Sequence, residues 1–218
     1  MAAITAMLSI AASAAPQDPT QSLPDAYKVE LENAYVKVIR VHYDAGATLP
    51  EHTHPAGTTA YVYLNDSEGV VFKHVGNNNR VVTRPPVKAG AIRIAAGQEE
   101  HHTAENTSST PSDFLRIVFK TDNGGVRNLR QRLAPTDVEF ANKQMRITRL
   151  RVKPGQNLHI EAKDSPTLRI AMREGITQWT PPPPDLLRWL DNGTTEEFAV
   201  TGDFPVDIIR IDFLTKPR

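Results

Sequence analysis

The sequence has 218 residues, enough for one large or two small domains. Its 25 Lys and Arg balance its 25 Asp and Glu, and this zero net charge argues against nucleic acid or an anionic membrane surface as a partner. The absence of cysteine excludes disulfides, thiolate ligands and cysteine nucleophiles, so any metal would have to be bound by His, carboxylate, amide, hydroxyl or water.

The first 26 residues look like a targeting segment followed by a linker. Residues 2–15 are small and apolar, and the sequence "ASA" before "APQDP" resembles a small-residue cleavage site. This pattern predicts an export signal, a mature chain that begins near Ala15 or Gln17, and a periplasmic or secreted protein. The basic start typical of such signals is missing, so an Ala-rich tail is the alternative. The apolar stretch is too short to span a bilayer.

Short β-strands are expected from residue 27 onwards. The segments "VKVIRVHY", "AYVYL", "GVVFKHV", "AIRIA" and "FLRIVF" are rich in β-branched or aromatic residues and are bounded by Gly, Pro, Asn or Asp. Many short strands in about 95 residues are typical of a sandwich or a small barrel. We therefore expect an all-β domain over residues 27–121.

Two histidine groups in this region suggest a metal site. His52 and His54 are separated by one residue, and because side chains alternate faces along a strand, both rings should point the same way. The block "GAIRIAAGQEEHHTAEN" adds His101 and His102, of which only one can face inward if the segment is extended. Solvated surface histidines are the alternative interpretation of both groups.

These residues resemble the two motifs of the cupin superfamily. The first motif is a glycine, five intervening residues and then His-x-His, which Gly46, His52 and His54 match. The second places a histidine four residues before an asparagine, after a glycine, a strand and a turn. Gly90, His102 and Asn106 match it. The resemblance implies that His52, His54 and His102 are metal ligands and that His101 points outward.

The sequence departs from the cupin pattern at one ligand. Members of the superfamily usually carry a Glu shortly after the histidine pair, and Thr59 occupies that position here. A neutral hydroxyl is a poor metal ligand. Glu51, Glu99 and Glu100 could supply a carboxylate only if a turn or an irregular strand brings one of them inward.

Three imidazole ligands favour a divalent transition metal (Zn, Fe, Ni or Cu) over Mg or Ca, which prefer oxygen ligands. The resemblance implies an enzyme of oxygenase or isomerase type that acts on a small molecule, but the superfamily also includes non-enzymatic binding proteins. A structural or vestigial metal site is therefore the alternative, including a protein that acts through oligomer contacts. No catalytic residue and no other cofactor follow from the sequence.

The rest of the chain repeats the first part. "VELENAYVKVIRVHYDAG" matches "VEFANKQMRITRLRVKPG", and Val29 to Val138 and Gly46 to Gly155 are both separated by 109 positions. A second match, between residues 92–107 and 187–202, has an offset of 95. The repeat predicts a second domain over residues 136–218, joined by a linker at residues 122–135 that includes a candidate short helix. The expected fold is two tandem cupin jelly-roll barrels.

The second copy should have lost the metal site. At these offsets His52, His54 and His102 correspond to Glu161, Lys163 and Glu197, which would form a polar cluster or point to solvent. An ammonium there would repel a cation. Four further residues of the first copy could line its interior, although each is more often a surface residue: Asp44, Glu68, His74 and Arg93. Trp179 and Trp189 are expected to be packing residues, and "TPPPPD" (180–185) a rigid connection. A monomer and a homodimer are both compatible with this internal pairing.

Overall fold

The computed structural model describes residues 18–75, 79–121, 140–173, 186–200 and 203–217. The predicted cleavage site, the linker at 122–135, Trp179 and the "TPPPPD" segment lie outside these residues. The described part contains one short helix, α1 (Pro19–Ser22), capped by Asp18, and otherwise strands. None of its helices has the length and apolar character needed to cross a bilayer.

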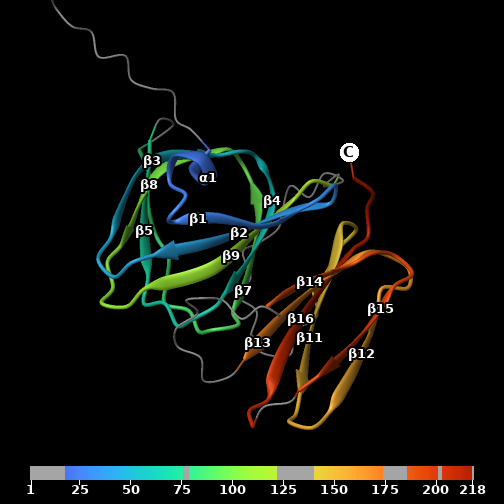
Figure 1. The fold of residues 1–218 in the computed structure, drawn as a ribbon. Coiled ribbons are helices and arrows are strands. Elements are labelled where there is room, and N and C mark those ends of the chain that lie inside the picture. The colour runs from blue at the N-terminus through green and yellow to red at the C-terminus, as the bar shows by residue number, and fades with distance from the viewer. Residues whose placement is uncertain (1–17, 76–78, 122–139, 174–185, 201–202, 218) are drawn as a thin grey trace, which may run out of the picture.

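The N-terminal half, residues 27–121, consists of two antiparallel sheets. Its strands are β1 (Tyr27–Glu32), β2 (Val36–Tyr43), β3 (Thr48–His54), β4 (Gly57–Tyr63), β5 (Val70–His74), β6 (Val81–Thr83), β7 (Ile92–Gly97), β8 (Glu100–Asn106) and β9 (Ser112–Phe119). One sheet has the order β1-β2-β9-β4-β7 and the other the order β3-β8-β5-β6. Figure 1 shows the two sheets enclosing a common interior.

The C-terminal half, residues 140–217, repeats this arrangement. Its strands are β10 (Phe140–Ala141), β11 (Met145–Val152), β12 (Asn157–Glu161), β13 (Thr167–Arg173), β14 (Leu187–Leu190), β15 (Thr195–Ala199) and β16 (Val206–Phe213). The five-stranded sheet has the order β10-β11-β16-β13-β14, the counterpart of the first sheet strand by strand, and β12 pairs with β15 as β3 pairs with β8.

This correspondence confirms the predicted all-β fold of two jelly rolls. Gly46 and Gly155 even adopt similar positive φ angles, 68° and 74°, in the turns before β3 and β12, where glycine avoids the steric cost of a Cβ atom. The described strands of each half form two separate sheets that face each other rather than one continuous closed barrel.

The two halves are joined by an apolar core between their five-stranded sheets. The core includes Ile92 and Leu115 from the N-terminal half and Met145 and Ile211 from the C-terminal half. Phe213 lies at its centre, and its ring centroid is 5.1 Å from that of Phe119. The halves therefore exclude water together over one face of each sheet.

Aromatic residues from both halves complete this core. The ring centroid of Trp189 is 5.2 Å from that of Phe213 and 5.6 Å from that of Tyr35, as expected of a packing residue. Arg149 of β11 also donates a hydrogen bond to the carbonyl oxygen of Gly90 in the other half.

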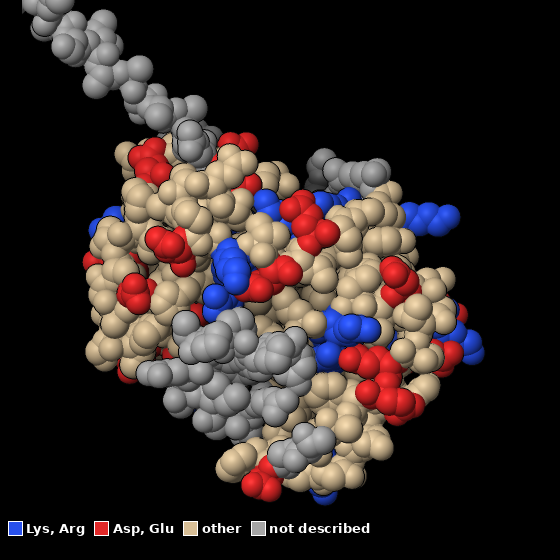
Figure 2. Space-filling model, viewed as in Figure 1, with Lys and Arg blue, Asp and Glu red and all other residues tan. Residues whose placement is uncertain are grey.

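The opposite faces of the five-stranded sheets line the interior of each half, and the two interiors differ. In the N-terminal half the inner face carries large aromatic residues such as Tyr43, Tyr61 and Phe114. In the C-terminal half smaller aliphatic residues such as Val152, Ile160 and Ile208 form the buried cluster. On the face of the molecule shown in Figure 2, basic and acidic side chains are interspersed.

Candidate metal centre

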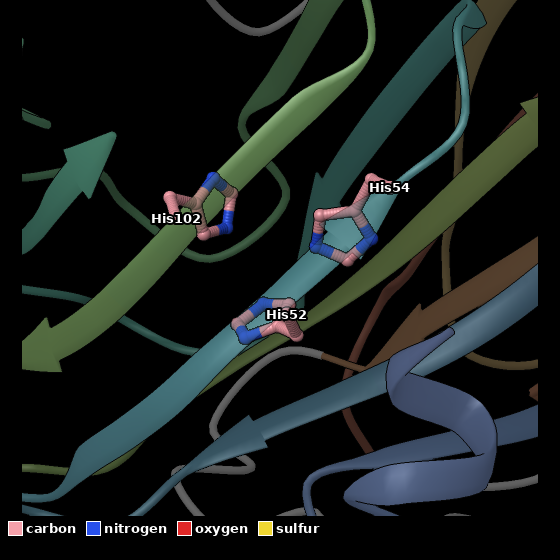
Figure 3. A group of neighbouring side chains, drawn as sticks. All are labelled: His52, His54 and His102. Carbon is pink, nitrogen blue, oxygen red and sulfur yellow. The ribbon is translucent and has the colours of Figure 1, made fainter. Parts of the chain in front are cut away.

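Three histidines meet inside the N-terminal half. β3 carries His52 and His54, and the neighbouring strand β8 carries His102 directly opposite His52. All three are buried, and one potential ligand atom from each lies within 4.8 Å of the others. Figure 3 shows the three rings turned toward one another. The structure thus brings together the three residues that the sequence predicted as ligands.

An irregularity in β3 aims the two histidines inward. The register with β8 shifts by one residue between Leu49 and His52, and both intervening residues, Pro50 and Glu51, are exposed. This is a β-bulge, one of the few places in a sheet that tolerate proline. Because of the extra residue, Leu49 and His52 face the same interior although they are three positions apart.

The surroundings of the histidines keep their rings neutral. Burial, reinforced by the charge of Arg116, holds the pKa of His54 far below the ordinary value of about 6.5. Burial lowers the pKa of His102 to about 2, and it also lowers that of His52. A neutral imidazole has a lone pair to offer, so all three rings are in the state that binds metals.

Hydrogen bonds determine which ring nitrogen of His52 carries the proton and which carries the lone pair. Nδ1 lies 2.8 Å from the carbonyl oxygen of Pro50, which can only accept, so Nδ1 carries the proton and Nε2 the lone pair. The hydroxyl of Tyr27 lies 2.8 Å from Nε2 and therefore donates to it, while the hydroxyl of Tyr43 lies 2.6 Å from that of Tyr27. Burial raises the pKa of Tyr27, so it remains a protonated phenol.

The ring of His102 has no hydrogen bond in the described part of the chain. Both of its nitrogens are buried and lack a partner there. Its neighbours are the ring of Phe72, with a centroid distance of 4.9 Å, and the rings of the other histidines. A buried polar group without a partner is costly, and a metal ion is one group that satisfies such a nitrogen. The donor set therefore fits a divalent transition metal.

The other acidic and histidine side chains near the motifs lie apart from this group. His101 points outward, as the resemblance implied, and its Nε2 lies beside a carboxylate oxygen of Glu51, whereas Glu99 is exposed. Glu100 faces the interior but lies 3.4 Å from Nη1 of Arg116. Thr59 is buried, and its hydroxyl donates to the carbonyl oxygen of Gly57. Among the described residues the group of potential ligands contains no carboxylate.

A pocket adjoins the histidines. His54 and His102 form part of its wall, and His74 and Arg93, two of the four residues considered as lining from the sequence, do so as well. The other two, Asp44 and Glu68, are exposed. Sequence reasoning did not single out several further lining residues: Tyr27, Tyr43, Tyr61, Arg84 and Arg116. Period-two alternation from Phe114 could have indicated Arg116.

The equivalent positions in the C-terminal half differ from those expected. The backbone hydrogen bond from Asn106 to Ala47 has its counterpart in the bond from Val200 to Gln156. Counting along the strands from these bonds places Glu196 at the position of His102.

On the neighbouring strand β12, the positions that correspond to His52 and His54 also lie one residue earlier than the offset of 109 predicts. β12 has no bulge, and Ile160 lies opposite Glu196, as His52 lies opposite His102. The counterparts of the three histidines are thus Ile160, Ala162 and Glu196. The predicted Glu161, Lys163 and Glu197 are one residue away and exposed.

The inward position of Glu196 is taken up by a charge pair. Nη2 of Arg169 lies 3.0 Å from Oε1 of Glu196, and the guanidinium of Arg169 lies over the ring of Phe198. Ile160 and Ala162 are apolar. The described residues of this half therefore provide no group of metal ligands.

Comparison with solved structures identifies similar folds at low sequence identity. AerE from Microcystis aeruginosa matches with a TM-score of 0.55 and 12% identity, over 87% of this chain and 97% of that chain. The bacterial pirin YhhW from Escherichia coli, in complex with nickel(II), matches with a TM-score of 0.50 and 13% identity, over 88% and 91%. A cupin domain from Bordetella pertussis Tohama I matches 43% of this chain and 91% of its own, with a TM-score of 0.37 and 20% identity. Neither a family model nor a curated protein matches the sequence.

Proposed function

We propose that the chain, whose histidine motifs resemble those of the cupin superfamily and whose fold is similar to that of a nickel-bound pirin, is a metal-dependent enzyme of oxygenase or isomerase type that acts on a small molecule. His52, His54 and His102 would hold one divalent transition metal ion in the N-terminal half. Zinc, iron, nickel and copper are the candidates, since imidazole nitrogen suits these ions better than magnesium or calcium.

The observation that carries the proposal is the environment of His102. Its two ring nitrogens are buried without a hydrogen-bond partner in the described residues, and they lie beside two other neutral imidazoles. A histidine kept only for packing would be expected to have at least one bond. Its position in the wall of a pocket gives a bound ion access to a ligand.

A bound ion would supply Lewis-acid chemistry at the coordination positions that three histidines leave open. The chain's own groups would orient the reaction. The carbonyl of Pro50 fixes the tautomer of His52 and leaves Nε2 as its metal-binding nitrogen. The Tyr27 hydroxyl donates to the same lone pair in this structure, so it would have to move off Nε2 when an ion binds. The aromatic wall, which includes Tyr63 and Phe114, limits the access of water.

The alternative is a binding protein whose metal, if bound, is structural. Thr59 favours this alternative, because its hydroxyl is engaged with the Gly57 carbonyl and the usual carboxylate ligand is missing. The two functions differ in one measurable property, which is whether a coordination position of the ion exchanges its ligand.

Metal content tests the site. Tag-free protein should be loaded with each candidate ion in turn and dialysed, and its metal content per chain should be measured by inductively coupled plasma mass spectrometry. We expect one ion per chain in the wild type and in His101→Ala, the matched control, and loss of most of the metal in His102→Ala. Two ions per chain, or full occupancy in His102→Ala, would contradict the assignment.

Ligand exchange distinguishes the enzyme from the structural alternative. The visible absorption spectrum of the Co²⁺-loaded protein should change when azide is added, because azide enters an open coordination position. An unchanged spectrum at high azide concentration would favour a closed, structural site.

A further inference from the structure

Arg93 occupies an unusual place for a charged side chain. It lies on β7 between Ile92 and Ile94, which face the core between the two halves, so it faces the interior of the N-terminal half. Only 6% of its surface is exposed, and it lines the pocket beside the histidines. Its guanidinium carbon lies 3.7 Å from the centre of the Tyr61 ring, which supports one face of the group.

The ring of Tyr61 does not satisfy the hydrogen-bond donors of Arg93. Nε and Nη1 are buried, and neither has a partner in the described part of the chain. An arginine stays charged at any physiological pH, and a buried charge without a partner is strongly unfavourable. Arg116, by comparison, donates to the Tyr61 hydroxyl at 3.0 Å and to Glu100 at 3.4 Å. The local carboxylate is thus used by Arg116.

The pocket as a whole has an excess of positive charge. Among the residues that the structure describes, its wall contains three arginines, Arg84, Arg93 and Arg116, and one carboxylate, that of Glu100. Burial lowers the pKa of Arg84, and the neighbouring charge of Arg93 lowers it further. Two cations that repel each other in a partly buried wall are stabilised by an anion between or beside them.

The remaining wall is apolar and aromatic. Val70, Phe72 and Phe114 line the same pocket as the arginines. A hydrated inorganic anion gains nothing from such surfaces, whereas the body of an organic molecule is removed from water against them. A planar guanidinium, whose donors pair along its edges, also matches the two oxygens of a carboxylate, and Nε and Nη1 of Arg93 leave one donor without a partner on each of two edges.

We propose that the pocket binds an organic carboxylate, with the carboxylate group paired to Arg93 and the apolar or aromatic body packed against the phenylalanine wall. This inference names the ligand class of the enzyme proposed above. It rests on that proposed function for the carboxylate being a substrate, but not for the binding of the carboxylate. Carboxylate binding itself can be measured with or without a metal ion.

Benzoate is a suitable probe, with benzamide as its neutral counterpart and inorganic phosphate as an anion without an apolar body. Binding of each to the zinc-loaded and to the metal-free full chain should be measured by isothermal titration calorimetry. The variants are Arg93→Gln, Arg93→Lys and, as a matched control, Arg80→Gln, which changes an exposed arginine outside the pocket. Circular dichroism verifies that each variant is folded.

We expect benzoate to bind the wild type more tightly than benzamide or phosphate. Arg93→Gln should weaken benzoate binding about 10-fold to 100-fold, as loss of charge-assisted hydrogen bonds does, and should leave benzamide binding unchanged. Arg93→Lys keeps the positive charge but loses the paired donors of the guanidinium, so it should weaken benzoate binding by a smaller factor than Arg93→Gln. Arg80→Gln should behave like the wild type.

Several results would overturn the inference. These are benzoate binding no tighter than that of benzamide, equal benzoate affinity in Arg93→Gln and the wild type, or phosphate binding tighter than that of benzoate. If Arg93→Gln does not fold, Arg93→Lys decides, and benzoate affinity equal to that of the wild type would then count against the pairing. A wild type that binds benzoate through Arg93 but takes up no metal would contradict the proposed enzyme and leave this inference standing.

Discussion

Replacing His102 with leucine should stabilise the metal-free protein and abolish its response to metal. In the metal-free protein both nitrogens of this buried ring lack a partner, which costs about 1–3 kcal/mol for an unsatisfied polar group. Leucine has a similar size and would pack against Phe72 without leaving a large cavity. At about 2–4 °C per kcal/mol for a chain of this length, the unfolding temperature should rise by about 2–12 °C.

When metal is added, the wild type should become more stable than His102→Leu. At a zinc concentration 100 times the Kd, the wild type gains about 2.7 kcal/mol, whereas His102→Leu keeps only two ligands and gains little. Thermal unfolding followed by circular dichroism, with chelator and with zinc, measures both effects. His101→Leu, in which only the outward histidine is changed, should retain the zinc response. A metal-free His102→Leu less stable than the wild type, with an undiminished response to zinc, would refute the reasoning.

Two further predictions concern stability. Phe213→Ala should cost about 3–5 kcal/mol, because it opens a cavity against Phe119 in the core between the two halves, and the urea midpoint should fall accordingly. A loss below about 1 kcal/mol would mean that the core adapts to the cavity. Burial lowers the pKa of His42, but hydrogen bonds to Asp113 and Asp44 outweigh it and raise the pKa overall. The stabilisation is therefore complete below the unfolded-state pKa of about 6.5 and is lost as the pH rises through the folded-state value, so His42→Gln should lower the urea midpoint more at pH 5.5 than at pH 9. An equal effect at both values would rule out the charged pair.

Period-two alternation predicted the placement of the histidines well. It put His52 and His54 on one face, and the choice of His102 over His101 as the inward residue agrees with the structure. Alternation works here because both strands are regular over the residues concerned. Whether the three bind a metal stays a prediction.

The constant repeat offset failed where a strand is irregular. The offsets read from the sequence aligned His52 with Glu161, but the bulge at Pro50 and Glu51 adds one residue to β3, and a one-residue shift exchanges the two faces of a strand. Proline inside a strand was the only available sign of the bulge. The sequence named Arg93 as a possible lining residue, but it could not decide its direction, because that depends on which face of β7 meets the other half.

The apolar core between the two five-stranded sheets also has a consequence for how the copies can diverge. Because both sheets belong to one polypeptide, their association is intramolecular, with an effective concentration on the order of millimolar or higher, and dilution cannot separate them. The C-terminal copy needs only its outer sheet face to keep this attachment. Its interior, with Ile160 and Ala162 where the other copy has histidines, can change independently of the surface that holds the molecule together.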